Sequence, residues 1–186
     1  HFFKVYLYTK KFFFSINSLP IFTKMTKKIM VMIPPASGHV NPMCSLVHEL
    51  CKQSADLEVI FYSDIEFREA IEQTGAHFRP YSHLTFSDLP DQLMSTTTNR
   101  FCFLIDKMIT FSYDLLPQLL ADVQTDRPDL IIYDCFFVTG KHLMNILNSR
   151  YQSKLSEIEP PKSVMFFPNF AMNEKIGKKF QTPFTK

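Results

Sequence analysis

Glycine is scarce in this sequence, with only 4 glycines among 186 residues. A dinucleotide-binding fingerprint needs three glycines in the turn between a strand and a helix. The segment from Pro34 to Pro42, which follows the first predicted strand, holds only Gly38. A Gly-rich phosphate loop is therefore excluded, and a nicotinamide-dependent oxidoreductase is disfavoured.

Paired cysteines and metal-ligand spacings are also missing. The four cysteines, Cys44, Cys51, Cys102 and Cys135, form no CxxC pair and no cluster with histidine. This pattern predicts no metal site and favours reduced thiols in a cytoplasmic protein. The formal net charge of +2 is too small to indicate nucleic acid or an anionic membrane as a partner.

No apolar run is long enough for a transmembrane segment. In residues 1–24, lysines at positions 4, 10, 11 and 24 interrupt every apolar run, so none approaches the ~20 residues that a bilayer span requires. Because Met25 follows directly, we interpret residues 1–24 as an extension of doubtful origin, explained by a gene-model artefact, and residues 25–186 as the domain. A weak targeting segment or an appended strand is the alternative.

Hydrophobic patterning predicts strands that alternate with helices. The unbroken apolar run from Ile29 to Ile33 is typical of a strand buried on both faces of a parallel sheet. Apolar residues from Met43 onwards follow helical spacing, with Asn41 as the expected N-cap and Pro42 in the first turn. Further strands are expected at 56–63, 76–81, 129–134 and 163–167, and helices at 65–74, 99–124 and 138–150. This order predicts an α/β, Rossmann-like parallel sheet flanked by helices.

Two stretches depart from this regular order. Residues 82–98 are polar and turn-rich, which is typical of a long loop that is either functional or disordered. Pro117 interrupts the helical pattern of 99–124, which predicts either a kinked helix or two helices meeting near Tyr113.

Two polar residues follow predicted strands. His39 comes after the first strand, and Asp134 ends the strand at 129–134. Parallel strands bring their carboxyl ends to one edge of the sheet, where open α/β sheets bind ligands. We therefore expect His39 and Asp134 to meet there. The structural alternatives are a loop histidine bonded to backbone and an aspartate that caps the next helix.

The resemblance to a known family rests on three stretches: PPASGHVNPMCSLVHEL, FREAIEQTGAHFRPY and PDLIIYDCFF. Together they resemble the N-terminal half of a family 1 UDP-glycosyltransferase of the two-domain GT-B fold, of the macrolide-transferase type. The resemblance runs from Lys27 to Asn173. Its specificity comes from the combination of Gly38–Pro42, Phe67–Ala70 and Asp134.

The resemblance implies an acceptor-binding domain in which His39 matches the catalytic base and Asp134 matches the aspartate that orients it. The implied reaction is inverting transfer of a hexosyl group from a UDP-sugar to a hydroxyl of a small lipophilic acceptor. An acceptor hydroxyl is a poor nucleophile at neutral pH, so its attack needs a base within hydrogen-bond reach. Such a step requires no metal, and no cofactor is expected on this half.

Apolar residues near the two polar ones are candidates for contact with a lipophilic acceptor. The candidates are Gly38, Phe101, Met108, Phe136 and Phe137. Phe101 and Met108 fit helical spacing, so plain core packing is their alternative.

Nothing after Phe167 resembles the Gly-rich donor signature of the family. The sequence therefore predicts a truncated acceptor half that is inactive alone and whose C-terminal donor domain is supplied in cis or in trans. The alternative is a non-catalytic acceptor-binding half that assembles with a separate donor-binding subunit.

Overall fold

A single parallel sheet forms the centre of the molecule. The computed structural model describes residues 27–82 and 97–168. Five strands lie in the order β3-β2-β1-β4-β5, and each neighbouring pair is parallel. They are β1 (Lys27–Met32), β2 (Leu57–Ser63), β3 (His77–Pro80), β4 (Leu130–Asp134) and β5 (Lys162–Phe166). The predicted α/β, Rossmann-like sheet is confirmed, with strand bounds within two residues of those expected.

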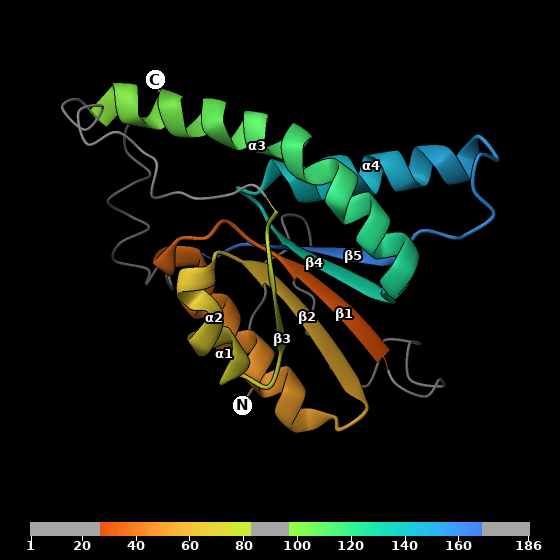
Figure 1. The fold of residues 1–186 in the computed structure, drawn as a ribbon, viewed down its shortest axis with the longest axis horizontal. Coiled ribbons are helices and arrows are strands. Elements are labelled where there is room, and N and C mark those ends of the chain that lie inside the picture. The colour runs from red at the N-terminus through yellow and green to blue at the C-terminus, as the bar shows by residue number, and fades with distance from the viewer. Residues whose placement is uncertain (1–26, 83–96, 169–186) are drawn as a thin grey trace, which may run out of the picture.

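Helices cover both faces of this sheet, as Figure 1 shows. They are α1 (Ser37–Gln53), α2 (Arg68–Glu72) after the 3₁₀ turn η2 (Ile65–Phe67), α3 (Thr97–Asp126) and α4 (Val138–Gln152). Successive side chains of β1 alternate between the two resulting cores. Met30 and Met32 pack with α3 and α4, whereas Ile29 and Val31 pack with α1 and α2. Because both faces are covered, the stretch from Ile29 to Ile33 is one unbroken apolar run.

Helix α1 begins earlier than its sequence pattern predicts. It starts at Ser37 with Ala36 as N-cap, so the prediction of Asn41 as the N-cap is wrong. His39 consequently lies in the first helical turn, not in a loop before it. Val40 provides the reason, since it is fully buried and extends the apolar stripe of Met43 backwards by one turn.

The segment between β2 and β3 begins with a capping aspartate, and its helix is divided in two. The side chain of Asp64 accepts a hydrogen bond from the backbone N–H of Glu66 at 3.4 Å. The helix then continues as η2 and α2 and ends at Glu72, two residues before the predicted end. Gly75 has a φ of +92°, a left-handed conformation that glycine adopts without steric cost.

Helix α3 is continuous through Pro117, and its ribbon bends partway along (Figure 1). The kinked helix is therefore the correct alternative, and two separate helices are excluded. Most of the predicted loop at 82–98 lies outside the described residues, since the structure describes it only at Ser82 and from Thr97 onwards. The predictions for residues 1–24 also lie outside them.

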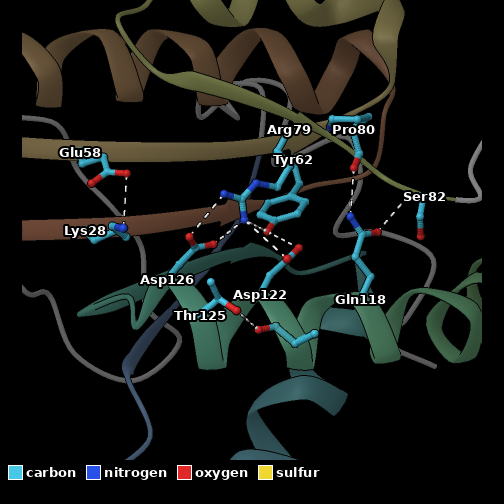
Figure 2. A network of polar contacts seen from close by, with 11 residues as sticks. Lys28, Glu58, Tyr62, Arg79, Pro80, Ser82, Gln118, Asp122, Thr125 and Asp126 are labelled. Atoms are coloured by element: carbon cyan, nitrogen blue, oxygen red, sulfur yellow. Dashed lines mark hydrogen bonds and ion pairs between the residues drawn. The ribbon is translucent and has the colours of Figure 1, made fainter.

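A polar network ties α3 to β2 and β3, as Figure 2 shows. The guanidinium of Arg79 on β3 donates two hydrogen bonds to the carboxylate of Asp126. It also donates to the hydroxyl of Tyr62 at 2.9 Å. That hydroxyl donates in turn to Asp122 on α3 at 2.8 Å. The network holds the C-terminal part of α3 against this side of the sheet.

The Arg79→Met variant is expected to lose about 2 kcal/mol of unfolding free energy. The substitution removes the hydrogen bonds that Arg79 donates to Asp126 and to the Tyr62 hydroxyl. Because Arg79 is partly exposed, the loss should be smaller than that for a broken buried ion pair. Arg68→Met is the matched control, because Arg68 pairs with Glu72 on the surface at 2.9 Å. Urea denaturation should show a loss under about 0.5 kcal/mol for the control. Equal losses in both variants would contradict the assigned role of the network.

Candidate active site

Two adjacent strands bring His39 and Asp134 to the carboxyl edge of the sheet. Met32 at the end of β1 is in register with Tyr133 near the end of β4. The chain passes from β1 into the first turn of α1, which carries His39, and Asp134 is the last residue of β4. Side chains separated by 95 positions in sequence therefore meet at one rim.

The two side chains are joined by a hydrogen bond of 2.8 Å between Nδ1 of His39 and Oδ2 of Asp134. Asp134 is fully buried, whereas the His39 side chain is 24% exposed. A carboxylate only accepts hydrogen bonds, so the contact assigns the proton of a neutral imidazole to Nδ1. Within residues 27–82 and 97–168, Nε2 of His39 has no hydrogen-bond partner. The arrangement therefore offers a free basic nitrogen on the exposed side of the ring.

Backbone groups after β4 fix the other oxygen of the Asp134 carboxylate. Oδ1 accepts a hydrogen bond from the backbone N–H of Phe136 at 2.7 Å. The carbonyl of Asp134 accepts another from the N–H of Phe137 at 3.0 Å. Because both carboxylate oxygens have partners, the buried carboxylate is held in one orientation toward His39.

The pKa of the neighbouring Cys135 thiol depends partly on this carboxylate. Burial is the main cause that raises the pKa of Cys135 to about 11, and the charge of Asp134 is the second. The Cys135 thiol therefore stays protonated and unreactive at neutral pH. Cys44, Cys51 and Cys135 are free cysteines, and the cytoplasmic location predicted from the cysteines stays a prediction.

The two phenylalanines after Asp134 separate in space. The ring of Phe136 meets the His39 imidazole edge to face, with centroids 5.6 Å apart, and is 50% exposed. Phe137 is 4% exposed and packs in the core, 5.4 Å from the ring of Tyr81. Sequence reasoning missed Tyr81, although its place at the end of the predicted strand 76–81 put it on this same rim.

The structure does not test the remaining candidates for acceptor contact, Gly38, Phe101 and Met108. Gly38 is exposed in the first turn of α1 and borders a shallow hollow with Ser37, Asn41, Pro42 and Ser45. Phe101 and Met108 belong to α3, but their side chains lie outside the described part of the structure. The pocket prediction for these three residues stays a prediction.

The described part of the chain holds neither a cluster of metal-binding residues nor a helix that could span a membrane. There, no group of three or more His, Cys, Asp or Glu residues is arranged to hold a metal ion. Over the same ranges, no helix combines the length and apolar character needed to cross a membrane.

Sequence comparison finds glycosyltransferases among the curated proteins, although no family model matches the chain. NDP-glycosyltransferase YjiC of Bacillus subtilis is 34% identical over 114 residues, which is 61% of this chain and 28% of the relative. 4'-Demethylrebeccamycin synthase of Lentzea aerocolonigenes is 27% identical over 125 residues, 62% of this chain and 29% of the relative. The chain thus spans less than a third of the length of these two relatives.

Comparison with solved structures gives the same fold. The calicheamicin glycosyltransferase CalG4 matches with a TM-score of 0.59 at 19% identity, over 84% of this chain and 36% of the other. The glycosyltransferase of kitacinnamycin matches with a TM-score of 0.55 at 23% identity, over 83% of this chain and 34% of the other. The relatives and structural neighbours of this chain are therefore GT-B glycosyltransferases of family 1, and the matched shares are consistent with part of their N-terminal half.

Proposed function

We propose that this chain is the acceptor-binding half of an inverting UDP-glycosyltransferase that transfers a hexosyl group to a hydroxyl of a small lipophilic acceptor. The observation that carries the proposal is the 2.8 Å contact between Nδ1 of His39 and Oδ2 of Asp134. It leaves Nε2 as a base on the exposed side of the imidazole. The related protein YojK of Bacillus subtilis is named as a UDP-glucosyltransferase, which supports the donor class.

In the proposed step, Nε2 of His39 takes the proton of the acceptor hydroxyl while the oxygen attacks the anomeric carbon of the sugar. The bond from that carbon to the uridine diphosphate breaks, and its electron pair leaves with the diphosphate. A single displacement inverts the configuration at the carbon. Since the imidazole activates the hydroxyl, the step needs no metal, and we assign no cofactor to this half.

Asp134 has two parts in this proposal. Its carboxylate keeps the proton of the resting imidazole on Nδ1, and it stabilises the imidazolium that forms when Nε2 takes a second proton. Full burial of Asp134 strengthens both effects, because little water screens the charge.

We place the acceptor beside Phe136, whose half-exposed ring adjoins the imidazole. An apolar surface next to one basic nitrogen suits a lipophilic molecule that carries a hydroxyl. Gly38, Phe101 and Met108 would extend this surface.

We assign the UDP-sugar to a second domain, in cis or in trans, because the chain spans 28% of YjiC. Residues 25–186 are then the acceptor domain, and residues 1–24 an extension of doubtful origin. This half has the base but little of the donor site, so we expect no useful turnover from it alone.

Titration calorimetry on the 186-residue chain tests the assignment, with 4-methylumbelliferone as a phenolic acceptor and UDP-glucose as a donor. We expect the phenol to bind and UDP-glucose not to bind. Binding of UDP-glucose without the phenol would reverse the assignment.

Proton NMR of the product then tests the reaction in the complete transferase, expressed from a transcript sequenced through both ends of this reading frame. The α-linked donor should give a β-glucoside, whereas an α-glucoside would exclude a single displacement.

Phe136→Ala is expected to weaken binding of this phenol about 5-fold, because an aromatic contact contributes about 1 kcal/mol. Phe167→Ala is the matched control, since Phe167 is 46% exposed against 50% for Phe136. The same titration should show unchanged affinity for the control. An unchanged affinity of Phe136→Ala would remove this side chain from the acceptor site.

A further inference from the structure

The residue that follows β1 has an unusual hydrogen-bond partner. Ile33 is fully buried, and its backbone lies beyond the last paired residue of the strand, Met32. Buried backbone N–H and C=O groups need partners. A single phenol supplies both: the hydroxyl of Tyr81 accepts from the N–H of Ile33 at 3.1 Å and donates to its carbonyl at 3.0 Å.

The ring of the same tyrosine reaches the other connection of the candidate site. Tyr81 is 5% exposed, and its centroid lies 5.4 Å from that of Phe137. Phe137 donates its backbone N–H to the carbonyl of Asp134 at 3.0 Å. Tyr81 therefore contacts the start of the connection that leads to His39 and the end of the connection that leaves Asp134.

We propose that Tyr81 is a positioning residue that sets the separation of His39 and Asp134 by tying the β1–α1 connection to the β4–α4 connection. The inference rests on the proposed function, because the separation matters only if the pair acts on an acceptor. Pro34 and Pro35 stiffen the short path from Ile33 to His39, since the proline ring fixes φ. A displacement of Ile33 is thereby passed on to the first turn of α1.

The tyrosine is suited to this role at all working pH values. Burial is the main cause that raises the pKa of Tyr81 well above its ordinary value, and the charge of Asp134 contributes a smaller effect in the same direction. Its hydroxyl keeps its proton and so maintains both bonds to Ile33.

Nitrogen NMR of the His39 imidazole in the 186-residue chain tests the proposal with two matched variants. In the unchanged chain we expect the Nδ1–H tautomer. Tyr81→Phe removes both bonds to Ile33 but keeps the ring, so we expect the population of the Nε2–H tautomer to rise. Tyr62→Phe removes the hydroxyl of a tyrosine whose ring lies 5.7 Å from that of Tyr81 and does not bond Ile33, so it should leave the tautomer unchanged.

A structural role alone would lower the melting temperature in both variants without a selective change of tautomer. An unaltered tautomer in Tyr81→Phe, or an equal change in Tyr62→Phe, would overturn the proposal. On an Asp134→Asn background, Tyr81→Phe should add no further change, because the contact through which it acts is already lost. A further change of the His39 tautomer on the Asp134→Asn background would also contradict the proposal.

Two other measurements extend the test. Amide exchange in the unchanged chain should show a protected Ile33 N–H, and fast exchange would exclude the bond even if Tyr81→Phe failed to fold. In the complete transferase, Tyr81→Phe should lower kcat about 10-fold with KM unchanged, which is less than the ~10²-fold cost of a 1 Å misplacement; a rise in KM alone would oppose a positioning role. The NMR and exchange readouts involve no sugar, so they judge Tyr81 even if His39 proves not to be the base.

Discussion

Replacing His39 by alanine is expected to lower the kcat of the complete transferase by at least ~10²-fold, the usual scale for loss of a general base. Without Nε2, the acceptor must attack as a neutral hydroxyl, because the side chain at the exposed end of the His39–Asp134 pair is gone. The KM for the UDP-sugar should stay unchanged, since the proposal assigns the donor to another domain. Steady-state rates with UDP-glucose and 4-methylumbelliferone provide the measurement.

Two further variants separate chemistry from folding. His39→Gln retains an amide that can donate to Asp134 but has no basic nitrogen, so its loss should equal that of His39→Ala. His48→Ala is the matched histidine control, because His48 is exposed on the same helix α1, and its rate should be unchanged. A normal rate for His39→Ala would remove the catalytic assignment.

Asp134→Asn is expected to cost between ~10² and ~10⁴ in kcat, although the side chain keeps its shape. The amide oxygen can still accept from the N–H of Phe136, which turns the amide NH₂ toward Nδ1 of His39. Two donors cannot face each other, so the imidazole adopts the Nε2–H tautomer and its exposed nitrogen ceases to be a base. Steady-state rates measure the loss of kcat, and the imidazole NMR signals show the change of tautomer.

Labelling of Cys135 checks the same substitution in the chain alone. Loss of the Asp134 charge should lower the pKa of Cys135 from about 11 and speed its reaction with a thiol reagent at pH 8. Asp64→Asn is the control, because Asp64 follows β2 at the same edge and asparagine caps as well as aspartate. It should change neither the rate of transfer nor the labelling of Cys135. Full activity of Asp134→Asn would show that the carboxylate has no role in the reaction.

The losses of kcat caused by His39→Ala and by Asp134→Asn should not add. If His39 and Asp134 act as one unit, the double variant should be about as slow as His39→Ala, because the carboxylate has no imidazole left to orient. Multiplied losses would show that Asp134 acts on the reaction by another route.

The strands were predictable because their sequence signal is local. The strand from Ile29 to Ile33 is covered on both faces, so its apolar run has no polar interruption. The start of the first helix was harder to predict, since Val40 alone extends its apolar stripe upstream of the expected N-cap. Proline and asparagine at 41–42 resemble a helix start, but the burial of Val40 outweighs that local preference.

The sequence by itself determined the α/β order of elements and the edge at which His39 and Asp134 lie. Strand direction settles that edge, because all parallel strands present their carboxyl ends together. Only the tertiary structure decided that Phe136 faces solvent while Phe137 enters the core, and that Tyr81 bonds a backbone 48 positions away. Such contacts depend on which distant side chains fill the space around a residue, and no local pattern encodes that.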